Sequence, residues 1–451
     1  MNRRLTKRDI RFLVFMLVVH AFWFSIALAH KRIYMGDSFE YIYMALNIKE
    51  QGWFYAGNPG MPMMPEYLTL RPPLYSLFLG LVYTFTMNNW VVLVLQNLLS
   101  VFNVFYLRDT LRKLGYSRGY DYILLAFVIL YPARFVNANT IAPDLMLQTT
   151  ILIYFRHFVL LMQNRRWRNG VWMSAALIAG MMVKPVLYPF AIVHCVMMML
   201  VSRYMKNSTM RAGMVAMLPL LAAFLYMGWN GMRTGKVHFS STQSFNAVYY
   251  YYFFFSDKYG IDSAKHFLAD ERAQQAALPA FSDRYDHANK RGLQLLKDNF
   301  SSYMPYHIKH SARMLIDPGK GELDMFLGHL TLGGLYTKEK GGFYSVWKEQ
   351  GFAGIKRYME MHPTMPVIIV VLLFNILRLL GFIIFLFTRS VPLYLRLFVA
   401  ALVGYFCITT GPIANTRYFL PVSAVVIGCA TLGYQQLLLR QKNKSIIAVQ
   451  A

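Results

Sequence analysis

Apolar runs close to 20 residues long repeat along this chain, with short polar segments between them. A helix of about 20 residues crosses the hydrocarbon core of a bilayer and satisfies its own backbone hydrogen bonds there. Such runs cover residues 12–30, 73–87, 90–107, 121–136, 144–162, 170–183, 186–202, 212–230, 364–388, 393–411 and 418–439. The pattern predicts an all-α polytopic membrane protein.

Basic clusters decide which of these runs cross the membrane, because Lys and Arg concentrate on the cytoplasmic side. If 73–87 crossed, the basic loops at 108–118 and 163–168 would both lie outside; without that crossing, both lie inside. We therefore predict about ten transmembrane helices with both termini cytoplasmic. The segment 72–86 then becomes a juxtamembrane helix at the outer face. The first run lacks a small-residue cleavage site and is expected to be an uncleaved span.

Composition supports the membrane class. Hydrophobic residues make up 56% of the 451 residues and charged residues only 15%, whereas soluble domains carry about a quarter charged residues. The net charge of +25 comes mostly from short basic clusters between apolar runs, which is not the stripe that nucleic-acid binding requires. Cys195, Cys407 and Cys429 lie within apolar runs, so neither a disulfide framework nor a thiolate zinc site is expected.

This topology divides the chain into three parts. Residues 1–230 form an N-terminal transmembrane module whose first external loop is 31–89, residues 231–363 form a small external domain, and residues 364–451 form the C-terminal helices and a cytoplasmic tail. Well over half of the 21 acids fall in the middle part, as expected of a water-facing domain. Its Tyr/Phe run at 249–255 is expected to anchor at headgroup level, or to line a groove for an isoprenoid or sugar.

Ionisable residues at the margins of the apolar runs all fall on the outer side. Charge at such a margin is costly and is usually functional or paired. The residues are Asp37 and Glu40 in GDSFEY, Arg71 in LRPPLY, Asp144 in IAPDL, Lys184 in VKP and Arg417 in NTRYFLP. Their convergence on one side is more informative than any one of them.

The three acids have structural and catalytic interpretations. Asp37 and Asp144 stand where predicted helices begin, and a carboxylate there can accept backbone N–H bonds as an N-cap. A carboxylate held near the membrane surface also suits a general base acting on a hydroxyl or amine. Asp144 could alternatively orient the acceptor, bind a metal with Asp37 or neutralise Lys184. Glu40 is expected to be solvated or paired with an arginine.

The basic residues suit phosphate binding. Arg71 precedes two prolines, which favour an extended backbone, and a fixed guanidinium can hold phosphate oxygens bidentately. Snorkelling to lipid headgroups would explain Arg71 and Lys184 equally well. Arg417 lies in a short outer turn, where the positive-inside rule does not favour it. His307 and His310 lack an accompanying carboxylate cluster at ligand spacing and are expected to be surface residues.

Five segments occur in the order seen in the GT-C glycosyltransferases: GDSFEYIYMALNI, LRPPLYSLFLGLVY, IAPDLMLQTTI, VKPVLYPF and NTRYFLPVSAV. The chain most closely resembles the family 39-like branch, which includes the dolichyl-phosphate-mannose protein mannosyltransferases and the bacterial aminoarabinose transferase of lipid A. The resemblance implies a GT-C-like bundle with a first-loop catalytic acid, a second-loop acid and basic residues near the donor phosphate. These positions match, respectively, Asp37, Asp144, and the set Arg71, Lys184 and Arg417.

The same resemblance implies transfer of a sugar, with inversion, from a polyprenyl-phosphate donor to an acceptor glycolipid, glycan or protein. The reaction would take place on the periplasmic side of the inner membrane. No cofactor is assigned, and a divalent metal (Mg or Mn) stays open because two acids make an incomplete site. Many relatives place an acid directly after the first Asp. Here Ser38 follows Asp37 and Glu40 is offset, which is a departure from the protein mannosyltransferases.

A transporter or flippase for a lipid-linked sugar is the rival function. It predicts charges near mid-span and paired broken helices, whereas the charges here gather at one face. A non-catalytic scaffold for envelope assembly would not need the five charged segments. The sequence identifies neither the sugar nor the acceptor.

Overall fold

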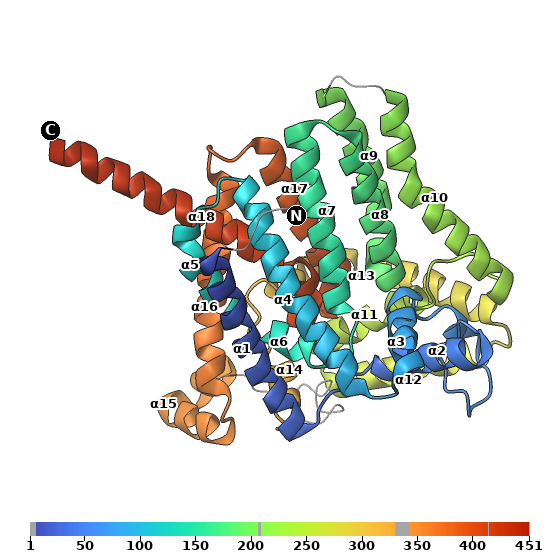
Figure 1. Cartoon of the computed structure of the whole chain (residues 1–451). Helices are drawn as coiled ribbons and strands as arrows, with labels where there is room; N and C mark the ends of the chain where they lie inside the picture. The colour runs from blue at the N-terminus through green and yellow to red at the C-terminus, as the bar shows by residue number, and fades with distance from the viewer. Residues whose placement is uncertain (1–5, 206–208, 330–342, 414, 451) are drawn as a thin grey trace.

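The computed structural model describes residues 6–205, 209–329, 343–413 and 415–450, and these residues form an assembly of helices (Figure 1). No strand occurs among them. One isolated parallel bridge joins Tyr34 to Ile141. The protein is therefore an all-α polytopic membrane protein, as the apolar runs predict.

Eight helical segments are long and apolar enough to cross a membrane. They are α1 (Lys7–His30), α4 (Asn89–Lys113), α7 (Asp144–Asn164), Pro185–Met205 with η3 (Pro185–Leu187) and α9 (Phe190–Met205), α10 (Thr209–Thr234), α16 (Met365–Phe387), α17 (Leu393–Thr410) and α18 (Thr416–Gln450). The 17-residue α8 (Trp167–Val183) runs beside α7 and leads back to α9 (Figure 1). Among the described residues, these eight segments and one bent pair give at most nine crossings, against about ten predicted; the tenth predicted crossing falls on α8, which is shorter than the eight.

The bent pair replaces the straight helix predicted at 121–136. After η2 (Arg118–Tyr120), α5 (Asp121–Ile129) ends and α6 (Pro132–Ala138) continues at an angle of 66°. Pro132 causes the break, because proline lacks an N–H and its ring clashes with the preceding helical turn. Every residue of α6 is buried, and burial in protein is what allows interrupted backbone at membrane depth.

The apolar run at 73–87 does not form a span. Its helix, α3 (Leu74–Phe85), has 12 residues, or about 18 Å at 1.5 Å per residue, against about 30 Å of hydrocarbon. It packs on α2 (Ser38–Gln51) through a cluster that includes Tyr41 and Leu79, whereas η1 (Pro65–Leu68) of the same loop contacts α10. The prediction that this run is a helix too short to cross the membrane is confirmed, and its place at the outer face stays a prediction.

The segment between α10 and α16 is helical. It contains α11 (Thr242–Tyr259), α12 (Ile261–Ala276), α13 (Phe281–Arg313), α14 (Lys320–Phe326) and α15 (Phe343–Met361). These helices gather with α2 and α3 at the lower end of the bundle in Figure 1, whereas α1 begins and α18 ends toward the upper end. In the Tyr/Phe run on α11, Tyr251 and Phe254 are buried against Tyr303. Those two rings form part of a protein core.

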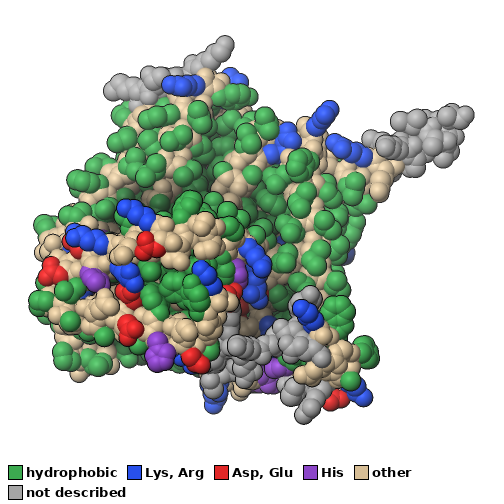
Figure 2. Space-filling model, turned by 180° about the vertical axis from the view of Figure 1, so that it is seen from behind, with side chains coloured by type: hydrophobic (Ala, Val, Ile, Leu, Met, Phe, Trp, Pro, Cys, Tyr) green, Lys and Arg blue, Asp and Glu red, His purple; other side chains and the backbone are tan. Residues whose placement is uncertain are grey.

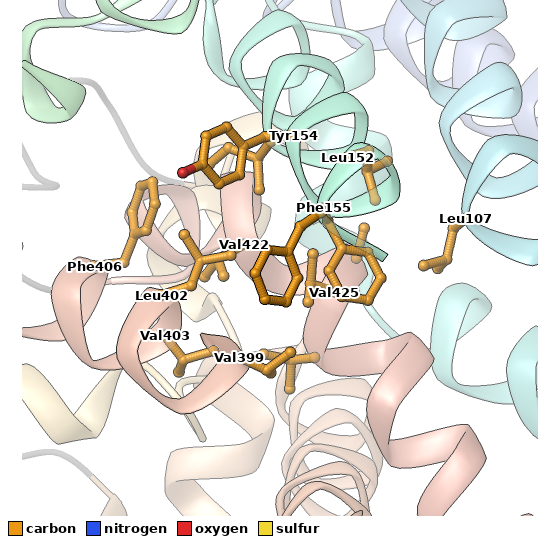
Figure 3. Packing of buried hydrophobic residues seen from close by; sticks show 14 of the residues in the cluster. Leu107, Leu152, Tyr154, Phe155, Val399, Leu402, Val403, Phe406, Val422 and Val425 are labelled. Carbon is orange, nitrogen blue, oxygen red and sulfur yellow. The ribbon is translucent and has the colours of Figure 1, made fainter. Parts of the chain in front are cut away.

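The main core lies where α7, α17 and α18 meet, and η4 (Gly411–Ile413) joins the last two. Figure 3 shows Tyr154 and Phe155 of α7 near Leu402 of α17 and Val422 of α18. Phe158 stacks on Phe398 at 4.0 Å between ring centroids. This packing fixes α18 against α7, and both helices carry candidate site residues at their N-terminal ends.

The two ends of the bundle differ in charge. On the face shown in Figure 2, acidic, histidine and many Lys and Arg side chains lie over the lower part, hydrophobic side chains lie above them, and the charged side chains toward the upper edge are Lys and Arg. Arg108, expected in a basic loop, instead lies within α4 and is 1% exposed. Its Nη1 donates to Asp9 at 2.7 Å and its Nη2 to Asp121 at 2.6 Å. Arg108 thus ties α1, α4 and α5 together.

Candidate active site

The two loops that carry the candidate acids are joined through Ser38 and Ile141. The Ser38 hydroxyl accepts from the Met35 N–H at 2.7 Å and donates to the Ile141 carbonyl at 2.6 Å. These bonds hold the start of α2 against the loop before α7, and so bring Asp37 close to Asp144. Ser38 is fully buried, and an ionised acid in its place would meet a carbonyl oxygen without water. A serine hydroxyl, which can donate to that carbonyl, therefore fits this position, and an ionised acid would not.

Arg417 contacts both of these acids. Its Nη2 donates to both carboxylate oxygens of Asp37 at 2.8 Å, and its Nε donates to Oδ2 of Asp144 at 2.9 Å. The other oxygen of Asp144 accepts from Lys184 Nζ at 2.7 Å. Four residues from distant parts of the chain thus form one ion-pair network, and none of their side chains is more than 13% exposed.

Arg71 and Glu40 form a second ion pair. Arg71 Nε lies 2.5 Å from Glu40 Oε2, and its guanidinium carbon stands 5.4 Å from the centroid of the Tyr41 ring. Of the two open interpretations of Glu40, the structure selects arginine pairing. The Glu40 side chain, 27% exposed, is more open than Arg71 at 15%.

Neither Asp37 nor Asp144 acts as a side-chain N-cap. Asp37 occupies the N-cap position of α2, but its carboxylate makes no capping bond. Pro143 is the N-cap of α7, and Asp144 lies in the first helical turn. Both carboxylates are directed to Arg417 instead. The interpretation of the two acids as helix N-caps is therefore wrong.

The electrostatics follow from burial and from these neighbours. Burial alone would raise the pKa of Asp37, but the positive charges of Arg417, Arg71 and Lys184 hold that pKa well below its usual range. Burial raises the pKa of Glu40 despite Arg71, and it lowers the pKa of Lys184 despite Asp144. With all six groups ionised, three acids balance three bases, so a bound phosphate would compete with carboxylates for the same cations.

A divalent metal does not fit this donor set. The described parts of the chain contain no group of three or more His, Cys, Asp or Glu residues that could hold a metal ion. The space between Asp37 and Asp144 is already bridged by the guanidinium of Arg417. These two acids therefore offer no oxygen cage of the kind that Mg or Mn prefers.

His307 and His310 are both partly exposed, and each also contacts a neighbouring helix. His307 Nε2 lies 2.9 Å from the Ile408 carbonyl oxygen, which links α13 to α17. His310 lies 3.5 Å from a carboxylate oxygen of Asp257, and its side chain is 14% exposed. Both histidines are half-buried contacts between helices.

Two acids assigned by sequence to the external domain reach the site. Asp317 and Glu322 lie against the first turn of α18, which carries Arg417. The local sequence, DPGKGELD, is rich in turn-forming residues and resembles an ordinary loop. Nothing in it signals contact with a helix that begins about 95 residues later.

Two buried arginines were also missed. Arg134 of α6 donates to Gln148 at 2.9 Å, and Arg378 of α16 stacks on the rings of Tyr131 and Phe419. Neither has a carboxylate partner among the described residues. Both lie inside apolar runs of the sequence. An arginine at such a position is itself a signal of function, because charge within a membrane segment is costly.

Comparison with known proteins gives one finding and two absences. No family model matches the chain, and no curated protein matches it either. The chain is similar in structure to ArnT from Cupriavidus metallidurans, solved in a crystal with undecaprenyl phosphate bound, with 13% identity and a TM-score of 0.39. The similarity covers 96% of this chain and 79% of that one. At this TM-score the similarity carries no argument about function, which must be inferred from the geometry of the site.

Proposed function

We propose that this chain is a membrane glycosyltransferase that moves a sugar, with inversion, from a polyprenyl-phosphate donor to an acceptor on the periplasmic side of the inner membrane. The observation that carries the proposal is the network in which Arg417 contacts Asp37 and Asp144, and Lys184 contacts Asp144. A sugar phosphate needs fixed cations, and an acceptor needs a carboxylate base. In this network the cations Arg417 and Lys184 are in direct contact with the carboxylates.

Asp37 is the proposed general base. Its carboxylate takes the proton from the acceptor hydroxyl or amine while that acceptor atom attacks the anomeric carbon from the face opposite the phosphate. The bond from the anomeric carbon to the phosphate oxygen breaks, and its electron pair stays on that oxygen. One displacement therefore inverts the configuration and leaves polyprenyl phosphate.

Arg71, Lys184 and Arg417 are the proposed donor-phosphate residues. Negative charge on the phosphate grows as the glycosidic bond breaks, and fixed cations in a water-poor site stabilise that charge. Arg417 now donates to both oxygens of Asp37, which makes Asp37 a weak base. A phosphate that draws Arg417 away would leave Asp37 more basic, so donor binding would activate the base.

The test is Asp37→Asn, measured as sugar transfer by the purified protein in lipid nanodiscs supplied with a labelled polyprenyl-phosphate sugar. We expect the rate to fall by about 10³-fold or more, because general-base catalysis contributes on the order of 10² to 10⁴. Asp109→Asn is the matched control, since Asp109 pairs with Arg156 and is 42% exposed. Transfer by Asp37→Asn at the unaltered rate would refute the mechanism.

Arg134 and Arg378 favour a second candidate, a flippase for the same lipid-linked sugar, because buried charges without acid partners can line a pathway. A flippase is also expected to have two broken helices in corresponding positions, and the described residues contain one broken helix, α5 with α6. Sealed vesicles separate the two functions. A flippase moves the labelled lipid between leaflets and forms no new glycosidic bond.

Mass spectrometry of glycolipids and glycoproteins from cells with and without the gene would then identify the sugar and acceptor.

A further inference from the structure

Thr416, the residue before Arg417, is held through all its polar groups. Its N–H donates to Asp317 Oδ2 at 3.1 Å, its hydroxyl donates to Glu322, and its carbonyl accepts from the Tyr131 hydroxyl at 3.0 Å. Thr416 is 1% exposed. Three separate elements therefore fix the first residue of α18.

Glu322 holds two successive residues of α18 with its two oxygens. One oxygen accepts from the Thr416 hydroxyl, and the other accepts from the Arg417 N–H at 3.3 Å. The first N–H groups of a helix have no partner within the helix and need acceptors from elsewhere. Asn415 supplies a third acceptor, for the Tyr418 N–H at 3.2 Å. The first turn of α18 is thus capped mainly by side chains of another segment.

The capping segment fits α18 closely. Gly319, just before α14, has φ of +74°, and its N–H donates to Asp317 at 3.2 Å. A Cβ added to Gly319 would lie 2.7 Å from the Thr416 hydroxyl oxygen and 3.1 Å from Glu322 Oε2. Glu322 itself is 5% exposed. The turn therefore leaves no room for α18 to shift toward it.

We propose that Glu322 and Asp317 are positioning residues of the transferase site, which fix the first turn of α18 so that the Arg417 guanidinium meets Asp37 and Asp144. Neither acid touches the reacting atoms, and both act through the backbone and side chain of Thr416 and the N–H of Arg417. The inference rests on the proposed function and assigns a role to the 317–326 end of the external segment.

The shape of the Glu322 side chain matters more than its charge. Burial, with Asp317 nearby, raises the pKa of Glu322 to about 7, so the group carries a proton for much of the time near neutral pH. A glutamine has the same shape. Its amide oxygen can accept from the Arg417 N–H, and its amide N–H can donate to the Thr416 hydroxyl oxygen. Glutamine should therefore rescue the position, whereas alanine should not.

The experiment compares Glu322→Ala and Glu322→Gln in nanodiscs, with a polyprenyl-phosphate sugar as donor. For Glu322→Ala we expect kcat to fall about 10- to 100-fold, the effect of displacing a group by about 1 Å. The donor KM should rise by a smaller factor than kcat falls, because the bound phosphate already carries one charge and gains another in the transition state. Glu322→Gln should retain kcat to within about threefold.

Asp324→Ala is the matched control. Asp324 lies on the same short helix and is as buried as Glu322, but it accepts from Thr364 at 2.5 Å and from Lys320 at 2.6 Å, with no bond to α18. We expect this variant to lose thermal stability and keep its kcat. A folded Glu322→Ala protein with unaltered kcat, or a Glu322→Gln protein as impaired as Glu322→Ala, would overturn the inference.

Two further measurements keep the test decisive. If Glu322→Ala does not fold, Glu322→Asp replaces it, because the shorter carboxylate keeps the charge but cannot reach both groups; an active Asp variant beside an inactive Gln variant contradicts the inference. Amide hydrogen exchange at residues 416–420 should be faster in Glu322→Ala than in Asp324→Ala, and equal rates contradict it. If the unaltered chain transfers no sugar, the proposed function fails, and hydrogen exchange alone decides whether Glu322 fixes α18.

Discussion

Arg417 lies between Asp37 and Asp144 and donates to both, with Nη2 on the first carboxylate and Nε on the second. The contacts join residues 380 and 273 positions apart in the chain. In the proposed reaction, one guanidinium therefore controls both the basicity of Asp37 and the binding of the donor phosphate. Substitutions at Arg417 should alter both properties.

Replacing Arg417 with lysine tests the need for two separate donor directions. A lysine ammonium is a point charge and cannot reproduce the planar fork that contacts two carboxylates. We expect Arg417→Lys to lower kcat/KM for the lipid-linked donor about 10²- to 10³-fold, the typical cost of losing one oriented donor in an active site. Arg156→Lys, at the Asp109 pair, is the control and should leave transfer unchanged. Near-normal kinetics for Arg417→Lys would exclude this role.

The pH dependence of transfer should report the pKa of Asp37. Burial would raise that pKa, but the cations outweigh burial and lower it. The carboxylate thus stays ionised even below its ordinary pKa of about 3.9, and activity is lost only when pH falls through the lowered value. In Arg417→Gln the chief cation is gone, so the acid limb of kcat/KM should move to higher pH. An unmoved limb in the residual activity would mean that Asp37 is not the base.

Much of the site could be predicted because charge at a membrane margin is costly. Asp37, Asp144, Lys184 and Arg417 each stood out for that reason, and the structure brings all four together. Their individual pairings could not be predicted. Which acid meets Arg417 depends on how α2, α7 and α18 pack, and no local spacing encodes contacts over hundreds of residues.

The fold, too, could be predicted from the sequence only in part. Sidedness of Lys and Arg correctly removed 73–87 from the predicted spans, because the positive-inside rule uses information that hydropathy lacks. Hydropathy failed at Pro132, since it measures apolarity and not backbone continuity. It also placed Arg108 in a loop, although two distant acids allow this arginine to be buried within α4.

Removal of Arg108 should destabilise the protein severely. Arg108→Ala would remove the partner that Asp9 and Asp121 share, each less than a tenth exposed, and would leave Asp9 with Arg112 and Arg118 and Asp121 with Arg8. Breaking a buried ion pair costs about 3–5 kcal/mol when the other charge is left unpaired, so the loss here should lie at the lower end of that range. Arg156→Ala is the comparison, because Asp109 is 42% exposed and such pairs contribute about 0–1 kcal/mol. Thermal unfolding in nanodiscs should show a much larger loss for Arg108→Ala, and equal losses would contradict the buried network.

Glu322 should make stability fall as pH rises. Its folded pKa of about 7 lies above the ordinary value of 4.5, so the folded state binds more protons between these values. The stabilisation is complete below the ordinary pKa and is lost as pH rises through the folded pKa, with a slope of at most about 1.4 kcal/mol per pH unit. Thermal unfolding from pH 5 to 8 should show a flatter dependence in Glu322→Gln, and an unaltered slope in that variant would contradict the assignment.

The membrane orientation of the site can be tested with two single cysteines in a chain whose three native cysteines are replaced. Asn88, at the start of α4, is exposed at the end of the bundle that carries the site, and Arg166, just before α8, is exposed at the opposite end. If the donor phosphate is bound on the periplasmic side, a membrane-impermeant maleimide should label Asn88→Cys in intact spheroplasts. Arg166→Cys should react only after permeabilisation. The reverse pattern would place Asp37 and Arg417 in the cytoplasm, where the acceptor would have to be cytoplasmic as well.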